Sequence, residues 1–455
     1  MLTAQRPAQW QRRADRGWHP TRMVVGGFAG AVVVGTGLLS LPLATESGRQ
    51  AHLVDALFTA TSAVCVTGLV TVDTGSYWSW FGEAVILLLI QAGGLGIMTL
   101  ATLFTVLLSQ RLGVRAKFLA QAETKALDLA GLRRLVRNIV LFSLVSEAVA
   151  AAVLTARLAL AYDEPFGQAL YHGVFHAISA FNNAGFSPYP DNLMRFVTDP
   201  LVSVTVCAAI IIGGLGFPVV FELLREWRKP RGWSVLTRIT LAVTGALLAL
   251  GTVVFTLVEW ANPRTFGALG PDDRWLAGFF ASAQTRTAGF NSVDIGAMRP
   301  ESLLASDVLM FIGGGSAGTA GGIKVTTFGL LALVIWAEMR GDQHVNVGYR
   351  RAPTANHRQA LSVALLGVGA VVAATFTMLS VTRFELDVVL FEVVSAFGTV
   401  GLSTGITARL PIPADLALVA LMFLGRLGPL TFATALALRD RRRRFAYPEE
   451  RTIVG

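Results

Sequence analysis

Charged residues are scarce in this sequence of 455 residues: Asp, Glu, Lys and Arg make up 15% of it, whereas hydrophobic residues make up 53%. A soluble domain has too little interior to bury so much apolar surface, so a soluble fold is excluded. Cysteine is scarce too, with only Cys65 and Cys207, in separate segments. Two isolated cysteines exclude a disulfide framework and a CxxC metal site, and we interpret them as buried free thiols.

Long apolar runs indicate the class of protein. Each run reaches or exceeds the roughly 20 residues that a helix needs to cross about 30 Å of hydrocarbon. Five runs contain no charged residue: 23–45, 84–110, 201–221, 239–258 and 359–382. Three more carry isolated charges: 138–160, 308–337 and 416–438. We predict an all-α integral membrane protein with eight transmembrane helices, the first being too long for the apolar part of a secretory signal.

Basic residues gather on one side of the predicted membrane. We assign 27 Lys and Arg to that side, in 1–22, 111–137, 225–238, 340–358 and 439–455. The opposite loops hold eight: Arg49, Arg195, Arg264, Arg274, Arg286, Arg299, Arg383 and Arg409. This positive-inside pattern predicts a protein of the cytoplasmic membrane with both termini in the cytoplasm. The basic stretch 439–444 then anchors the chain at anionic headgroups of the lipid bilayer, and we expect no nucleic-acid partner.

Four segments on the external side share a pattern centred on a glycine. When Gly68, Gly185, Gly289 and Gly401 are aligned, a phenylalanine lies ten positions earlier in every copy. A small residue lies six positions earlier, and a large apolar residue follows the glycine. The segments are too short to span a bilayer, so each is predicted to be a re-entrant helix followed by an extended loop. The alternative for any one segment is an ordinary external turn.

The predicted unit is a span, a re-entrant helix, a loop and a second span, repeated four times around a central pore. The pore repeats occupy 23–108, 138–226, 234–340 and 357–438. The remainder is a cytoplasmic N-terminus (1–22), a cytoplasmic loop (109–137) and a basic cytoplasmic tail (439–455). Two spans in each repeat agree with the eight apolar runs.

The glycine loops have the chemistry of a cation filter. Directing several carbonyl oxygens at one axis needs backbone angles that glycine admits easily, and rings of carbonyls can replace the hydration shell of a cation. The re-entrant helices would also point the negative ends of their dipoles at this axis. The candidate ion-binding residues, none of them charged, are Val66, Thr67, Gly68, Asn183, Ala184, Gly185, Thr287, Ala288, Gly289, Thr399, Val400 and Gly401.

A glycine-rich stretch, 313–324, interrupts the second span of the third repeat. Its six glycines are incompatible with a stable helix, since each costs up to about 1 kcal/mol relative to alanine. At membrane depth such a loop must line a cavity or be buried, and beneath a filter it is a candidate gate. A phosphate-binding loop is excluded because no strand precedes it. The candidate gating residues are Gly313, Gly314, Gly315, Gly318, Gly321, Gly322, Lys324 and Arg426.

Arg426 lies in the middle of the last predicted span, where a charge usually faces a cavity or the bundle interior. We expect it to oppose cations or to hold the gating loop through the loop's carbonyl groups. The alternative is a structural pairing with Glu147. Glycine pairs at 93–94 and 213–214 indicate close packing or a kink near the cavity.

Three polar residues of the re-entrant helices have simpler interpretations than catalysis. His172 and His176 have metal-ligand spacing, but no further ligand lies near them in the sequence. We therefore expect local hydrogen bonds. Glu392 is interpreted as packing or dipole support.

The four loop motifs resemble those of the bacterial Ktr/Trk potassium uptake superfamily, and the resemblance covers essentially the whole chain. They are VCVTGL ending at Leu69, SAFNNAGF at Phe186, TRTAGFN at Asn291 and SAFGTVGLSTG at Gly405. Eight spans match KtrB-type membrane subunits, and a glycine in every loop is similar to the potassium-selective members. Sodium-carrying plant relatives often have serine in the first loop, where this chain has Gly68.

The resemblance implies potassium uptake, with K⁺ as the transported ion and no covalently bound cofactor. It implies that 313–324 obstructs the pore and that Arg426 lies close to it. It also implies a homodimer regulated by a separate cytosolic nucleotide-binding ring subunit. A sodium or mixed sodium–potassium transporter of the same superfamily is the alternative. A membrane enzyme is disfavoured because no catalytic set recurs near a span, and a transporter with inverted repeats because the copies share one orientation.

Overall fold

Helices make up nearly all of the regular structure. The computed structural model describes residues 20–110, 129–342, 344–347, 350–351 and 353–428. Within these ranges the only strands are β1 (Asn346–Val347) and β2 (Arg350–Arg351), which form one antiparallel pair. The predicted all-α class is confirmed for the described residues, apart from this pair. Most of the predicted N-terminus, the predicted 109–137 loop and the predicted tail lie outside them.

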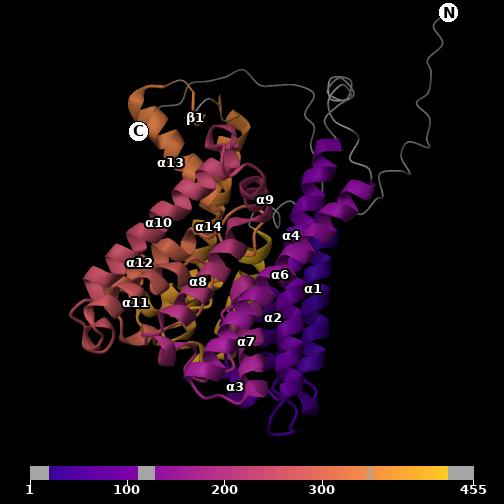
Figure 1. Cartoon of the computed structure of the whole chain (residues 1–455), viewed down its shortest axis with the longest axis vertical. Coiled ribbons are helices and arrows are strands. Elements are labelled where there is room, and N and C mark those ends of the chain that lie inside the picture. Colours follow the sequence, from indigo (N-terminus) through magenta and orange to yellow (C-terminus); the bar gives the residue numbers. More distant parts are fainter. Residues whose placement is uncertain (1–19, 111–128, 343, 348–349, 352, 429–455) are drawn as a thin grey trace, which may run out of the picture.

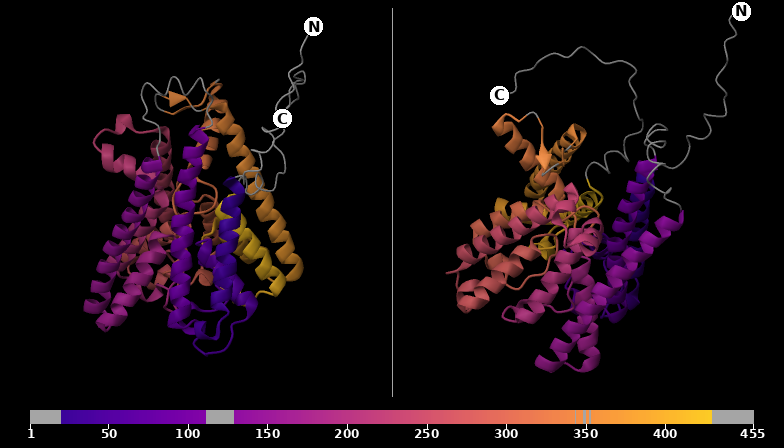
Figure 2. Two further views of the ribbon diagram at one scale, coloured as in Figure 1. Left: turned by 90° about the vertical axis from the view of Figure 1, so that its right-hand side faces the viewer. Right: turned by 45° about the horizontal axis from the view of Figure 1, so that its top comes forward.

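The helices α1, α4 and α6 lie side by side, and the chain runs between the long helices through short helices and loops (Figures 1 and 2). The long helices are α1 (Pro20–Leu39), α4 (Trp80–Gln110), α6 (Leu129–Ala161), α10 (Val235–Glu259) and α14 (Thr354–Val381). Four shorter ones, called loop helices below, each precede a glycine loop: α2 (Leu53–Val64), α7 (Phe166–Phe181), α11 (Pro271–Gln284) and α15 (Leu386–Gly398). The others are α3 (Thr74–Tyr77), α8 (Pro200–Leu215), α9 (Phe217–Glu226), α12 (Pro300–Phe311), α13 (Val325–Arg340) and α16 (Ile412–Leu427).

Three helices in the described part of the chain are long and apolar enough to cross a membrane: Arg134–Ala161, Val235–Glu259 and Asn356–Val381. A bent pair, Pro200–Leu215 with Phe217–Glu226, is a fourth candidate. The apolar segments Val24–Leu39 and Trp80–Gly96, which are parts of α1 and α4, are shorter. The count of eight spans therefore stays a prediction.

Within the described residues, two of the predicted spans are each divided into two helices. The run 201–221 bends by 100° between α8 and α9. At the bend Gly216 has a φ of 89°, and Pro218 lies in the first turn of α9, where proline can begin a helix but cannot continue one. The run 308–337 is divided into α12 and α13 by the glycine-rich stretch. Neither run is the single straight helix that its hydropathy suggests.

Glycines allow α4, α8 and α16 to approach the ends of loop helices. A β-carbon on Gly93 of α4 would collide with the carbonyl oxygen of Val64, the last residue of α2. Gly213 and Gly425 have the same relation to the last turns of α7 and α15. The close packing predicted for the glycine pairs is confirmed, and it fixes α2, α7 and α15 against α4, α8 and α16.

The loop helices are anchored by aromatic side chains. Phe58, Phe175 and Phe391, ten residues before the loop glycines, are fully buried. In α11 the aligned Phe279 is only partly buried, and the next residue, Phe280, is buried instead. The third loop helix therefore differs from the other three in the side chain that fixes it, a difference that the aligned sequence does not predict.

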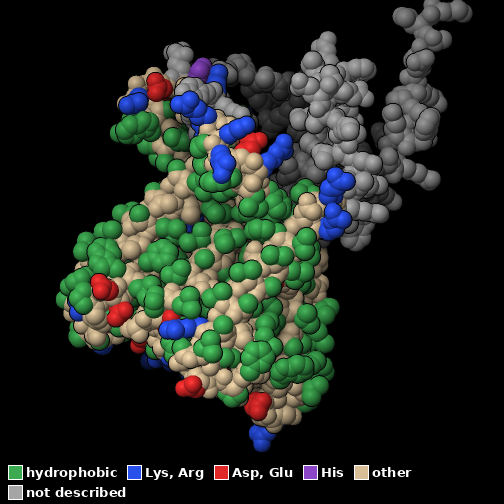
Figure 3. All heavy atoms as spheres, in the orientation of Figure 1, with side chains coloured by type: hydrophobic (Ala, Val, Ile, Leu, Met, Phe, Trp, Pro, Cys, Tyr) green, Lys and Arg blue, Asp and Glu red, His purple; other side chains and the backbone are tan. Residues whose placement is uncertain are grey.

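On the face that Figure 3 shows, hydrophobic side chains cover much of the helical body, and charged side chains gather towards its ends. Leu88, Leu160 and Phe376 are 70%, 83% and 75% exposed on α4, α6 and α14. Such a broad apolar surface would be unfavourable in water, whereas lipid is a suitable solvent for it.

Candidate functional site

Each loop helix ends at a loop whose backbone has the same unusual shape. Two positions before the loop glycine, φ is positive in all four: 54° at Val66, 60° at Asn183, 67° at Thr287 and 49° at Thr399. The glycines follow with 98° at Gly68, 71° at Gly185, 77° at Gly289 and 95° at Gly401. Residues with a β-carbon seldom adopt such angles, so their surroundings must hold them there.

The four loops meet in a closed ring. A β-carbon on any of the loop glycines would meet the carbonyl oxygen that lies just before the glycine of the next loop. The pairs are Gly68 with Ala184, Gly185 with Ala288, Gly289 with Val400 and Gly401 with Thr67. The last pair returns to the first loop, so the ring closes. Backbone thus occupies the space that side chains would fill, and the predicted filter segments lie together although more than 100 residues separate neighbouring ones.

Side chains of the loop helices hold the ring. The hydroxyls of Ser62 and Ser395 accept hydrogen bonds from the backbone N–H groups of Gly68 and Gly401, at 3.0 and 3.1 Å. The third loop has Ala283 at the aligned position. There the neighbouring Gln284 accepts from the backbone N–H of Phe290 at 3.2 Å. The sequence showed a small residue six positions before each glycine, but not that two of them serve as acceptors.

The ring also contains polar side chains without partners. The hydroxyls of Thr67, Thr287 and Thr399 are buried and have no hydrogen-bond partner among the described residues. A buried hydroxyl without a partner is costly. Oxygen atoms in this position, beside backbone carbonyls, have the chemistry that suits a dehydrated alkali cation.

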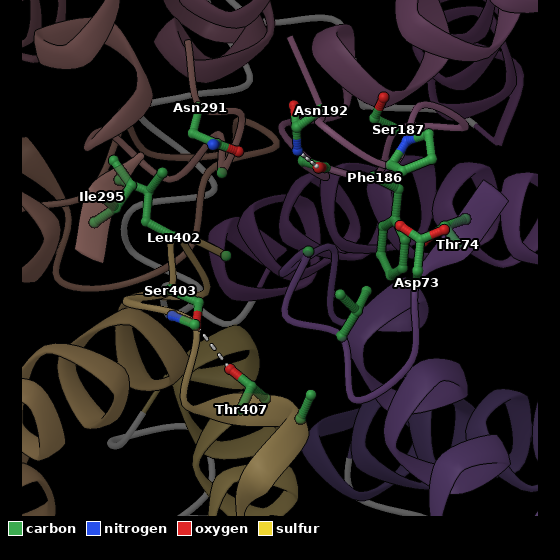
Figure 4. Close-up of a pocket in the computed structure, with 18 of the residues that line it drawn as sticks. Asp73, Thr74, Phe186, Ser187, Asn192, Asn291, Ile295, Leu402, Ser403 and Thr407 are labelled. Carbon is green, nitrogen blue, oxygen red and sulfur yellow. Dashed lines mark hydrogen bonds between the residues drawn. The ribbon is translucent and has the colours of Figure 1, made fainter. Parts of the chain in front are cut away.

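A cavity of about 370 Å³ opens on one side of the ring. All four loop glycines line it, together with the residues that follow them in each loop (Figure 4). Asn192 donates to the carbonyl oxygen of Gly185 at 3.4 Å, and Ser403 and Thr407 form a hydrogen bond of 3.0 Å. Asp73 and Asp294 bring negative charge to the same cavity. The arrangement is that of an acidic, water-accessible entrance to the ring.

The glycine-rich stretch 313–324 lies on the other side of the ring, packed against the end of α8. Backbone N–H groups of Gly315 and Thr319 donate to the carbonyl oxygens of Gly214 and Gly213, at 2.7 and 3.1 Å. A β-carbon on Gly321 would collide with the side chain of Thr399, in the fourth loop. All the predicted gating glycines therefore belong to one loop that contacts the ring.

Two cations hold this glycine-rich loop. Arg426, 3% exposed, donates to the carbonyl oxygen of Thr319 and, at 3.2 Å, to that of Gly93. Lys324 donates to the carbonyl oxygen of Ala320 at 2.5 Å. Hydrogen bonds from Arg426 to the loop's carbonyls were one of the two roles expected from the sequence.

The alternative pairing of Arg426 with Glu147 is wrong. Glu147 instead accepts from the side-chain amide of Gln91 at 3.1 Å and from that of Asn182 at 3.1 Å. Neutral amides donate to this carboxylate, whereas the Nη1 and Nη2 groups of the arginine donate to backbone carbonyls and its Nε has no partner among the described residues. The sequence gives no direct sign of either arrangement.

Arg286 is also not the exposed loop residue that the charge count assumed. It is 7% exposed and donates to the backbone and side-chain oxygens of Thr244, both at 3.3 Å, and to the carbonyl oxygen of Gly313 at 3.5 Å. Its position three residues before Gly289 puts it where the chain turns into the ring. The glycine-rich loop thus has a third cation at its beginning.

Buried polar residues tie the outer part of two loops back to their helices. Glu392 accepts from Ser403 at 2.5 Å and from the backbone N–H of Thr404 at 3.0 Å. His176, at the aligned position of α7, forms a hydrogen bond of 3.0 Å with Ser187. His172 is bonded to Glu164 at 2.9 Å. The local hydrogen bonding predicted for both histidines is confirmed.

Comparisons with known proteins agree with this geometry. The family of cation transport proteins called TrkH matches residues 23–443. The chain is 41% identical to Ktr system potassium uptake protein B of Vibrio alginolyticus, over 98% of this chain and 97% of that protein. It is 38% identical to the protein of the same name in Bacillus subtilis, over 96% and 97%.

A solved structure shows the same fold. The potassium transporter TrkH from Vibrio parahaemolyticus superposes with a TM-score of 0.74 at 17% identity, over 93% of this chain and 86% of that one. Sequence and fold therefore lead to one assignment. The chain is a membrane protein that belongs to the TrkH family of cation transport proteins.

Proposed function

We propose that this protein mediates potassium uptake across the cytoplasmic membrane, with the ring of four glycine loops as its selectivity filter. The observation that carries the proposal is the closed contact series that joins Gly68, Gly185, Gly289 and Gly401. Full-length relatives named as potassium uptake proteins support K⁺ as the transported ion.

The filter works through dipoles rather than charges. Carbonyl groups of the twelve predicted filter residues replace water around the ion, and the threonine hydroxyls add further oxygens. The loop helices end at the ring, so the negative ends of their dipoles favour a cation there. Acidic residues such as Asp73 and Asp294 raise the local cation concentration at the entrance.

The loop 313–324 acts as the gate. It contacts the ring at Thr399 and is held by Arg426 and Lys324, so its removal opens the path beneath the filter. Glycines give the loop the freedom to move, since they lose little on leaving one backbone conformation for another. A regulator of transport must therefore change the position of this loop.

The proposal extends to the larger assembly. Four pore repeats, at 23–108, 138–226, 234–340 and 357–438, supply eight spans with both termini in the cytoplasm. The functional form is a homodimer in the lipid bilayer, controlled by a separate cytosolic nucleotide-binding ring subunit. K⁺ is substrate, not a resident cofactor.

Uptake of ⁸⁶Rb⁺ into liposomes that contain the purified chain tests the proposal. We expect saturable uptake that unlabelled K⁺ inhibits more strongly than Na⁺. Equal inhibition by Na⁺ would favour the mixed sodium–potassium transporter. Absence of uptake with and without a K⁺ gradient would refute the function.

A further inference from the structure

Asn183 is the one asparagine among four aligned filter positions. The other three, two residues before the loop glycine, are Val66, Thr287 and Thr399. The side chain of Asn183 reaches further than any of these. Its Oδ1 accepts a hydrogen bond of 2.7 Å from the hydroxyl of Thr319, in the glycine-rich loop. Both residues are buried, so water cannot replace this bond.

Three hydrogen bonds join Thr319 of the glycine-rich loop to other parts of the chain. Its N–H donates to the carbonyl oxygen of Gly213 at 3.1 Å, and its carbonyl oxygen accepts from Arg426. Its hydroxyl donates to Asn183. Each of the three bonds goes to a different element, and only the one to Asn183 reaches the filter. A loop that leaves the ring must break all three.

Space around this bond is restricted. A β-carbon on Gly213 would lie 2.9 Å from the hydroxyl oxygen of Thr319, and one on Gly214 would lie 3.5 Å from the side-chain nitrogen of Asn183. The α8 glycines therefore leave a slot in which the two side chains meet. The Asn183 nitrogen has no partner among the described residues, so the contact with Thr319 is what fixes the carboxamide.

We propose that the Asn183–Thr319 hydrogen bond is a latch that couples the gating loop to the second filter loop. The inference rests on the proposed function of the ring and of 313–324. In the closed state the latch keeps the loop against the filter and occupies the carboxamide oxygen of Asn183. When the loop leaves, this oxygen loses its donor and becomes available beside the ion path.

A cysteine reporter measures the position of the loop independently of transport. Cys65 and Cys207 are the chain's two cysteines, and both are buried. Ser316→Cys places a thiol on a partly exposed part of the loop. Its labelling rate by a membrane-impermeant maleimide, from the cytosolic face of the reconstituted full chain, reports loop opening. ⁸⁶Rb⁺ uptake is measured on the same preparations.

Two substitutions remove the latch from opposite ends. Thr319→Val removes the donor at nearly constant volume, and Asn183→Thr installs the residue that the ring already accommodates at Thr287 and Thr399. Each should raise the labelling rate by about two- to tenfold, the effect of one buried neutral hydrogen bond. The double variant should exceed neither single one, because both remove the same bond. Thr319→Ser should behave like the native chain.

Thr252→Val is the matched control, because it removes a partly buried hydroxyl bonded within α10, away from the gate. Additive effects of the two single variants, or no effect of either, would overturn the latch. If Thr319→Val elutes as an aggregate, the labelling rates of Asn183→Thr and Thr319→Ser are compared instead. The latch predicts a raised rate for Asn183→Thr and a native rate for Thr319→Ser. A native chain without Rb⁺ uptake refutes the proposed function, whereas the labelling rates still decide on the latch.

Discussion

The closed ring predicts that Gly185 cannot accept even a methyl group without loss of transport. A β-carbon there would lie 2.8 Å from the carbonyl oxygen of Ala288 and 2.9 Å from the Cα of Gly289. Non-bonded atoms prefer about 3.5–4.0 Å, so the second and third loops must separate by roughly 0.5–1 Å. A displacement of about 1 Å in a positioned site can cost on the order of 100-fold in rate.

Gly341 provides a control with the same φ. It ends α13 with a φ of 71°, equal to that of Gly185, and nothing lies within 4 Å of a β-carbon there. Alanine at either position carries a similar backbone cost, about 1–2 kcal/mol for a left-handed residue. The difference between the two variants therefore isolates contact across the ring.

The assay is ⁸⁶Rb⁺ uptake into liposomes, with monodispersity and melting temperature recorded for each variant. Gly185→Ala should lose about 10- to 100-fold of the uptake, following the displacement estimate, whereas Gly341→Ala should retain it. If a folded Gly185→Ala protein transports as well as Gly341→Ala, the loops do not form the permeation ring.

Three further predictions concern the supports of the ring. Arg426→Gln removes the charged donor to Thr319 in the gating loop, a bond worth about 1.5–3 kcal/mol, so Rb⁺ uptake should rise at least about tenfold; unchanged uptake by a folded variant would contradict the proposal that Arg426 holds the loop. Ser62→Ala leaves the N–H of Gly68 buried without an acceptor and should lower the free energy of unfolding by about 1–3 kcal/mol, seen in thermal melts; Thr252→Val, outside the ring, should have a smaller effect, and equal losses would argue against the acceptor role. Burial alone would raise the pKa of Glu164, but hydrogen bonds with Tyr189 and His172 lower it below its ordinary 4.5. The stabilisation by charged Glu164 is present above its ordinary pKa and is lost as the pH falls through its lowered pKa. Glu164→Gln should therefore flatten the decline of melting temperature between about pH 5 and 3. If the melting temperatures of the native chain and the variant decline in parallel, this role of Glu164 is refuted.

The sequence predicts the glycine loops better than it predicts the bends of the helices and the partners of buried polar residues. Glycine spacing identifies the ring at Gly68, Gly185, Gly289 and Gly401, because only a few residue types suit its backbone angles. Hydropathy locates the helices but not the 100° bend between α8 and α9. That bend lies at Gly216, two residues before Pro218, and these two residues change the mean hydropathy of the run little.

Buried polar partners are the part that the sequence does not determine. The sequence predicts Arg286 to be an exposed loop residue, yet it is buried and donates to Thr244. The sequence suggests Glu147 as a partner of Arg426, yet Glu147 accepts hydrogen bonds from the side-chain amides of Gln91 and Asn182. Each of these bonds joins residues far apart in the chain, so partner choice depends on the packing of helices that the sequence pattern leaves open.

Location of the ion tests the central claim most directly. Crystals of the chain grown with Rb⁺ or Tl⁺ would show bound ions by anomalous diffraction. We predict peaks on the axis of the ring, among the carbonyl oxygens of Thr67, Ala184, Ala288 and Val400, that weaken when K⁺ replaces the heavy ion. Peaks confined to other parts of the protein, with none inside the ring, would contradict the account.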